Sequence, residues 1–75
     1  MVLTNHARQK IVRRGISEAR IAHAIKHGVR EPRGDKYRVW LPVSDDVKLG
    51  LIVAEEGGKQ VVVTVFERRP FKPRV

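Results

Sequence analysis

This sequence contains no cysteine, few aromatic residues and no long hydrophobic run. Without cysteine the chain can form neither a disulfide framework nor a thiolate metal site. Its uncharged segments are short, such as the five residues of 50–54, whereas a membrane-spanning helix needs roughly 20 apolar residues. No apolar run follows the first charged residues either, so we expect no secretory signal. These absences predict a cytoplasmic protein without a membrane helix.

Acidic residues are also scarce. Eight Asp and Glu face sixteen Lys and Arg, which gives a net charge of +8 over 75 residues. The excess is uneven, with +7 in residues 1–38, −2 in 39–66 and +3 in 67–75. A chain of this length forms one small domain, here 1–75, so the charge is expected to gather on one face of it. Such a face typically binds a polyanion, and we expect RNA or the ribosome as the partner.

Two helices are predicted in the first part of the chain, as a hairpin over 4–28. Thr4 or Asn5 can cap the first helix, and Gly15 follows it where a residue free to adopt positive φ is needed. Ser17 can cap the second helix, which Gly28 closes. The apolar residues recur at helical spacing and predict the buried side of each helix.

Strands are predicted in the second part. The segment 29–36 contains proline and glycine among charges and is expected to be a loop. Three strands follow at 37–41, 47–55 and 60–66. The residues 67–75 are expected to form a basic tail. The predicted fold is therefore α+β, in the order α-α-β-β-β, with the helical hairpin packed on a three- to four-stranded antiparallel sheet over 37–66.

One flank of the first helix carries a possible phosphate site. His6, Lys10 and Arg14 form a stripe beside the apolar side of the helix, and Arg13 adjoins it. An imidazole can move a proton near neutral pH, and the cations can stabilise charge on a phosphoryl oxygen. The alternative is a solvated basic flank with no catalytic role.

A second group of candidates lies on the strands. Strict alternation places Thr64 on the same face as Val62 and Phe66, where its hydroxyl could bind a phosphate or a ribose, although threonine is also an ordinary strand residue. Tyr37 is the expected stacking residue, whereas Trp40 and Phe66 are expected to anchor the core. The predicted nucleic-acid-binding residues are Arg13, Tyr37, Arg38, Arg68 and Arg69.

A metal site is not predicted. His23 and His27 have the spacing of a ligand pair, but Ala24 stands where a zinc-protease motif has glutamate, and no carboxylate completes a ligand set. Both histidines are expected on the solvated side of the second helix. We therefore predict no metal and no other cofactor.

Two sequence runs resemble the DUF4258 domain family. The run 6–17, HARQKIVRRGIS, is similar to the opening motif of that family, and 61–66, VVVTVF, is similar to its closing strand. The resemblance implies a fold akin to RelE- and ParE-type toxins and to barnase- and EndoU-like ribonucleases. It further implies metal-independent RNA cleavage, in which His6 moves a proton and Thr64 orients the phosphate. The cations that would stabilise the transition state are Lys10, Arg14 and Arg68.

A ribonuclease toxin and a binding module without catalysis are therefore the two functions to distinguish. The module would bind nucleic acid, the ribosome or a partner protein through the same basic stripe. Its affinity should survive His6→Ala but fall with Lys10→Ala or Arg13→Ala. For a toxin, an acidic antitoxin or immunity protein is an expected partner, because it could cover the positive face.

Overall fold

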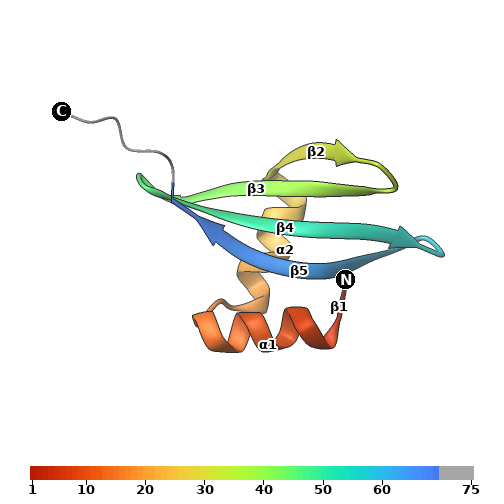
Figure 1. Cartoon of the computed structure of the whole chain (residues 1–75), viewed down its shortest axis with the longest axis horizontal. Helices are drawn as coiled ribbons and strands as arrows, with labels where there is room; N and C mark the ends of the chain where they lie inside the picture. The colour runs from red at the N-terminus through yellow and green to blue at the C-terminus, as the bar shows by residue number, and fades with distance from the viewer. Residues whose placement is uncertain (70–75) are drawn as a thin grey trace.

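The computed structural model describes residues 1–69 of the chain, which fold into two helices and a five-stranded sheet (Figure 1). In chain order the elements are β1 (Val2–Leu3), α1 (Asn5–Arg14), α2 (Glu18–His27), β2 (Val29–Arg33), β3 (Lys36–Ser44), β4 (Val47–Glu56) and β5 (Lys59–Arg68). The α+β class is confirmed. The predicted three- to four-stranded antiparallel sheet is wrong, because the order β1-β5-β4-β3-β2 includes β1, which runs parallel to β5.

The two extra strands explain this difference. β1 has only two residues and is a strand because it pairs with Val61 and Val62 near the start of β5. β2 occupies the segment expected to be a loop, and it pairs with β3 along its whole length through a tight turn. Gly34 enables that turn with a φ of 64°. Pro32 is tolerated because β2 is an edge strand.

The helix ends follow the predicted chemistry. The Thr4 hydroxyl accepts a hydrogen bond from the Ala7 amide at 3.1 Å, so Thr4 and not Asn5 is the N-cap of α1. Ser17 caps α2 in the same way through the Arg20 amide, also at 3.1 Å. Gly15 ends α1 in the left-handed conformation with a φ of 68°. Gly28, which ends α2, has an ordinary φ of −72°. A glycine fits this position because the backbone approaches β3 too closely to leave room for a side chain.

Both helices bury their apolar sides against one face of the sheet. α2 passes behind the strands in Figure 1, and α1 runs beside β5. The core joins residues from both helices to the middle strands: Leu3, Ala7, Ile11, Ile21, Ala24, Ile25, Val39, Leu49, Leu51, Val53, Val62 and Val65. We call the opposite side of the sheet, which neither helix covers, the open face.

A β-bulge in β5 changes which side chains reach the open face. Ile52 pairs with Thr64, but the next residue of β4, Val53, pairs with Val62, so Val63 is an extra residue. Val62 is consequently buried in the core, while Thr64 lies on the open face beside Ile52. The predicted sharing of one face by Thr64 and Val62 is therefore wrong, because alternation breaks at the bulge.

The last strand is longer than predicted. β5 continues to Arg68, so Glu67 and Arg68 belong to the sheet and not to a tail. Arg69 follows the strand, and residues 70–75 of the expected tail lie outside the described residues. Neither helix within residues 1–69 has the length and apolarity needed to cross a membrane.

Candidate nucleic-acid interface

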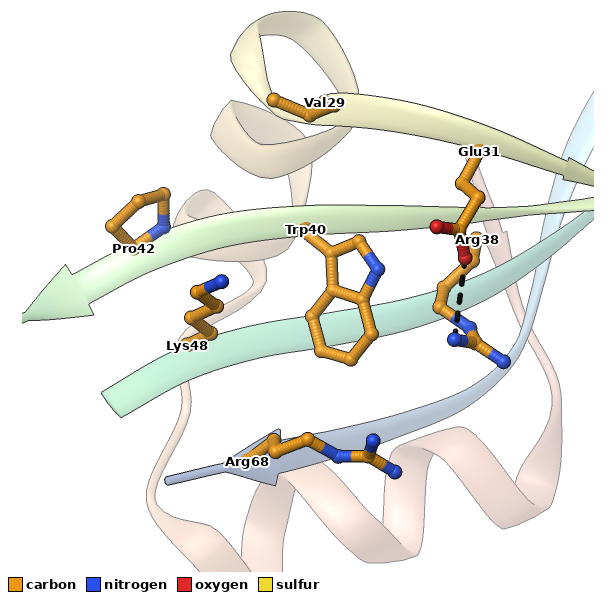
Figure 2. A pocket seen from close by; sticks show the side chains of 7 residues that line it. All are labelled: Val29, Glu31, Arg38, Trp40, Pro42, Lys48 and Arg68. Atoms are coloured by element: carbon orange, nitrogen blue, oxygen red, sulfur yellow. Dashed lines mark ion pairs between the residues drawn. The ribbon is translucent and has the colours of Figure 1, made fainter. Parts of the chain in front are cut away.

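The open face carries a hollow of about 450 Å³ centred on the only tryptophan of the chain. This volume lies within the range of about 300–1,000 Å³ that is typical of ligand sites. Figure 2 shows the side chains around it, which come from β2, β3, β4 and β5: Val29, Glu31, Arg38, Trp40, Pro42, Lys48 and Arg68. Three of these seven residues are cations.

Strand register explains why these residues meet. Residues at alternate positions of neighbouring strands form rows across the open face. The middle row consists of Val29, Trp40, Gly50 and Phe66. The row on one side of it consists of Glu31, Arg38, Ile52 and Thr64. The row on the other side consists of Pro42, Lys48 and Arg68. Each flanking row therefore brings at least one cation beside the aromatic middle row.

Arg38 is the most firmly held cation of the hollow. Its guanidinium forms an ion pair with Glu31 at 3.2 Å, and only 20% of its side chain is exposed. The Nε–H is buried and has no hydrogen-bond partner within the described part of the chain. A buried donor without a partner is costly, so a ligand oxygen that accepted its hydrogen bond would be favoured.

Arg68 and Lys48 are held less tightly. The guanidinium groups of Arg68 and Arg38 both lie over the Trp40 ring in cation–π contacts, 5.7 Å and 5.4 Å from its centre. Within residues 1–69, neither Arg68 nor Lys48 forms an ion pair. Two cations without a carboxylate partner therefore border the hollow and are available to an anion.

The stripe predicted on the first helix lies in the helix layer. Arg14, at the end of α1, donates to Glu67 at 3.3 Å and so ties the stripe to β5. His6 is exposed and Lys10 is half-buried. Neither side chain forms a hydrogen bond or an ion pair with another described residue. The stripe therefore presents two groups next to the last strand that no residue of 1–69 pairs with.

The stripe and Thr64 approach β5 from different sides. Glu67, the partner of Arg14, pairs with the core residue Leu49 and faces the helices. Thr64 pairs with Ile52 and lies on the open face. The structure thus brings Arg38 and Arg68 together around Trp40, and it brings Arg14 to β5. A ligand that contacted both His6 and Thr64 would have to cross β5.

The remaining predicted binding residues lie elsewhere. Tyr37 packs against the core on the helix side, where its hydroxyl accepts a hydrogen bond from the Gln60 amide at 3.2 Å. The Arg30 guanidinium covers the Tyr37 ring at 4.9 Å. Arg69 pairs with Asp46 at 3.4 Å. Arg13 is exposed at the end of α1, away from the hollow.

Comparison with protein families identifies the domain. A family model described as a domain of unknown function, DUF4258, matches residues 3–67, which run from β1 almost to the end of β5. The chain belongs to the DUF4258 family. No curated protein and no solved structure matches it. The matched region contains every described helix and most of the hollow, with Arg68 just beyond it.

The sequence pattern identifies only Arg38 and Arg68 among the seven residues that line the hollow of this DUF4258 domain. Val29 and Glu31 lie in the segment predicted as a loop, and Trp40 is predicted to anchor the core. Neither Pro42 nor Lys48 is predicted to bind a ligand. A signal was present, because Arg38, Trp40 and Pro42 occupy alternate positions and must share one face. The sequence does not show how neighbouring strands pair. Only the register of β3 with β4 and of β4 with β5 places Lys48 and Arg68 on the same face as Trp40.

The two histidines of α2 lie side by side on one side of the helix. The His23 and His27 rings are tilted by 46° with their centres 4.6 Å apart, and both side chains are exposed. Across residues 1–69, no group of three or more His, Asp or Glu side chains comes together in a way that could hold a metal ion. The pair therefore marks the solvent side of α2.

Proposed function

We propose that this DUF4258 domain binds RNA on the open face of its sheet. The observation that carries this proposal is the cluster of Arg38, Lys48 and Arg68 around Trp40, on a face that the helices leave free. Cations at the surface supply phosphate contacts, here Lys48 and Arg68 without an ion pair in residues 1–69 and Arg38 with its ion pair to Glu31, and the aromatic ring among them supplies a contact for a base. The net charge of +8 favours the same class of partner.

Binding to a labelled single-stranded RNA tests this function. Fluorescence anisotropy should show an affinity that falls several-fold in Arg68→Gln, because Arg68 borders the hollow. Arg20→Gln is the matched control, since it removes the same charge from an exposed position on α2. Equal weakening by both variants would mean that only the overall charge matters. Failure of the wild-type domain to bind RNA at low salt would refute the proposal.

We propose metal-independent RNA cleavage as the more specific activity. Its support is the fold akin to RelE- and barnase-type ribonucleases that the resemblance to DUF4258 implies, together with His6 and Lys10 beside β5, which have no hydrogen-bond partner among residues 1–69. In this reaction the ribose 2′-oxygen attacks the adjacent phosphorus while His6 moves a proton, and the bond to the leaving 5′-oxygen breaks. Lys10 and Arg14 would stabilise the added negative charge on the side of β5 where His6 lies, whereas Thr64 and Arg68 lie on the open face and would contact a different part of the RNA.

Cleavage is separable from binding by one substitution. His6→Ala should abolish cleavage of RNA in the presence of a chelator and leave the anisotropy titration unchanged, because His6 is exposed and contributes nothing to the core. Wild-type protein that binds RNA without cutting it would leave the domain as a binding module, which is the second proposed function. A His6→Ala variant that cuts normally would exclude the proposed role of the imidazole.

A toxin of this kind would act in the cytoplasm, where RNA and ribosomes are found, and would need an inhibitor. We propose an acidic partner protein, because negative charge would complement the open face. Expression of the domain should arrest growth, and co-expression of a small acidic protein encoded beside it should relieve the arrest. Unimpaired growth at high expression would count against toxicity.

A further inference from the structure

The middle row of the open face has an unusual composition. Gly50 sits in the centre of β4, paired with Trp40 on one side and Phe66 on the other. A Cβ atom added to Gly50 would lie 2.6 Å from two ring atoms of Phe66 and 3.0 Å from the Trp40 ring. The two aromatic rings therefore occupy the space of the side chain that this position lacks.

The indole plane of Trp40 consequently lies along the surface of the sheet, over Gly50. The rings of Trp40 and Phe66 meet edge to face, at 5.4 Å and 89°, so Phe66 supports the edge of the indole. Figure 2 shows the indole turned with its broad face toward the hollow. An aromatic ring fixed in this way is a flat, half-exposed apolar surface, and it loses little conformational freedom when a ligand covers it.

The surroundings of the ring match a nucleotide. Lys48 borders the ring, and the guanidinium groups of Arg38 and Arg68 lie over it. A base that stacks there would take their place against the indole and leave both cations to its phosphates. A base stacked on the indole would place its phosphates near these cations, and the unpartnered Nε–H of Arg38 could donate to one of the ligand oxygens. A base inside a duplex is already stacked and paired, so only an unpaired base can use the ring.

We propose that Trp40 is a stacking platform for an unpaired base, so that the open face selects single-stranded nucleic acid. This inference rests on the proposed binding of RNA and specifies its substrate class. It assigns Trp40, which the sequence pattern placed in the core, to ligand contact. It also assigns Gly50 a positioning role, because any side chain there would displace the indole.

The single tryptophan allows the proposal to be tested directly. We would titrate wild-type protein with single-stranded RNA of about eight nucleotides, with its duplex, and with an abasic oligonucleotide of equal length and charge. Stacking should quench the tryptophan fluorescence with the single strand and much less with the other two. The abasic strand should bind roughly tenfold more weakly, since stacking on an aromatic side chain is worth about that factor per base.

Two variants extend the test. Trp40→Leu should weaken the single strand about tenfold but leave the abasic strand unchanged, and Trp40→Phe should restore most of the loss because it keeps an aromatic face. Tyr37→Phe is the control on the helix side of the same strand and should behave as wild type. If Trp40→Leu does not fold, the comparison of intact and abasic strands on wild-type protein decides the question alone.

The outcomes separate this inference from the function on which it rests. If no oligonucleotide binds at low salt, the proposed RNA binding fails, and the stacking proposal fails with it. If intact and abasic strands bind equally and fluorescence changes equally, RNA binding stands and the stacking platform is refuted. Preferential binding of the duplex would also refute it.

Discussion

Gly50 is the residue on which the open face depends. A glycine inside a strand ordinarily lowers stability relative to alanine, because it has no side chain to pack and more backbone freedom to lose. Here the two rings of Trp40 and Phe66 already fill the position. Alanine at this position would therefore lower the stability of the domain, because its methyl group would overlap the two rings.

Gly50→Ala should lower the free energy of unfolding by about 1–3 kcal/mol, the usual cost of forcing extra atoms into a packed site. Urea denaturation followed by tryptophan fluorescence measures this change. The double variant Gly50→Ala/Phe66→Leu is the control, because trimming the ring should make the added methyl group less costly. A Gly50→Ala domain more stable than wild type would show that the rings move aside freely.

Single residues also show what the sequence could and could not predict. Thr4, Gly15 and Ser17 were predictable because a helix end is determined by a few neighbouring residues. The face of Thr64 was not predictable, because it depends on the extra residue Val63 in the pairing of β5 with β4. The local pattern in β5 contains no mark of that bulge.

At the scale of elements, the helices and the three long strands were predictable, whereas β1 and β2 were not. The helices and long strands have their own periodicity or β-branched content. β1 and β2 have neither, and they are strands only because β5 and β3 offer them a partner. The candidate site was predicted only in part for the same reason: Arg38 and Arg68 were named as binding residues, but the register that places them and Lys48 around Trp40 was not predictable.

The link between α1 and the sheet depends on one hydroxyl. Thr4 accepts from the Ala7 amide and donates to the Val63 carbonyl at 2.9 Å, so it both caps α1 and fastens it to β5. Ser17 caps α2 but has no such second bond. The two caps therefore have different structural roles although their sequence signals are alike.

Thr4→Ala should cost about 2 kcal/mol of stability and Ser17→Ala about 1 kcal/mol, because the first loses a cap and an interstrand tie and the second loses only a cap. Chemical denaturation of both variants gives the comparison. Thr4→Ser keeps the hydroxyl and should retain most of the stability. Equal losses for the two alanine variants would mean that the bond to Val63 contributes nothing.

At the scale of the whole molecule, the positive charge determines how the domain responds to salt. The open face offers the three cations of the hollow to a polyanion. Each phosphate contact to a single strand adds about 0.7 to the slope of log affinity against log salt concentration. The slope of affinity against salt therefore measures how many phosphates contact these cations.

The RNA affinity should fall with salt with a slope of about −2 if Arg38, Lys48 and Arg68 each contact a phosphate. Anisotropy titrations at several salt concentrations provide the slope. Lys48→Gln should reduce its size by about 0.7, and Arg20→Gln on α2 should leave it unchanged. A slope near zero would mean that phosphates do not contribute to binding.

One free edge of the sheet is β2, and we expect Pro32 to protect it. A proline in an edge strand offers no N–H to a second chain, which limits pairing between sheets. Four of the five residues of β2 are charged or proline, and all five are exposed. The edge therefore discourages self-association although Val29 is exposed there.

Pro32→Val should increase association between copies of the domain, because it restores a backbone donor and adds a β-branched residue at the edge. Sedimentation velocity over a range of protein concentrations detects this. Pro32→Lys also restores the donor but adds a charge, so it should stay at the wild-type association state. Identical behaviour of all three proteins would show that Pro32 does not protect the edge.

The pairing of β1 with β5 has a consequence for how the domain forms during synthesis. Residues 2–4 bind the backbone of residues 61–63, so the first strand of the domain finds its partner only after the last strand has been made. Until β5 leaves the ribosome, α1 has no strand to pack on and its buried residues stay in contact with water. Contacts of such long sequence separation slow folding. The nascent domain should therefore gain its structure, and with it any activity, only once β5 has left the ribosome.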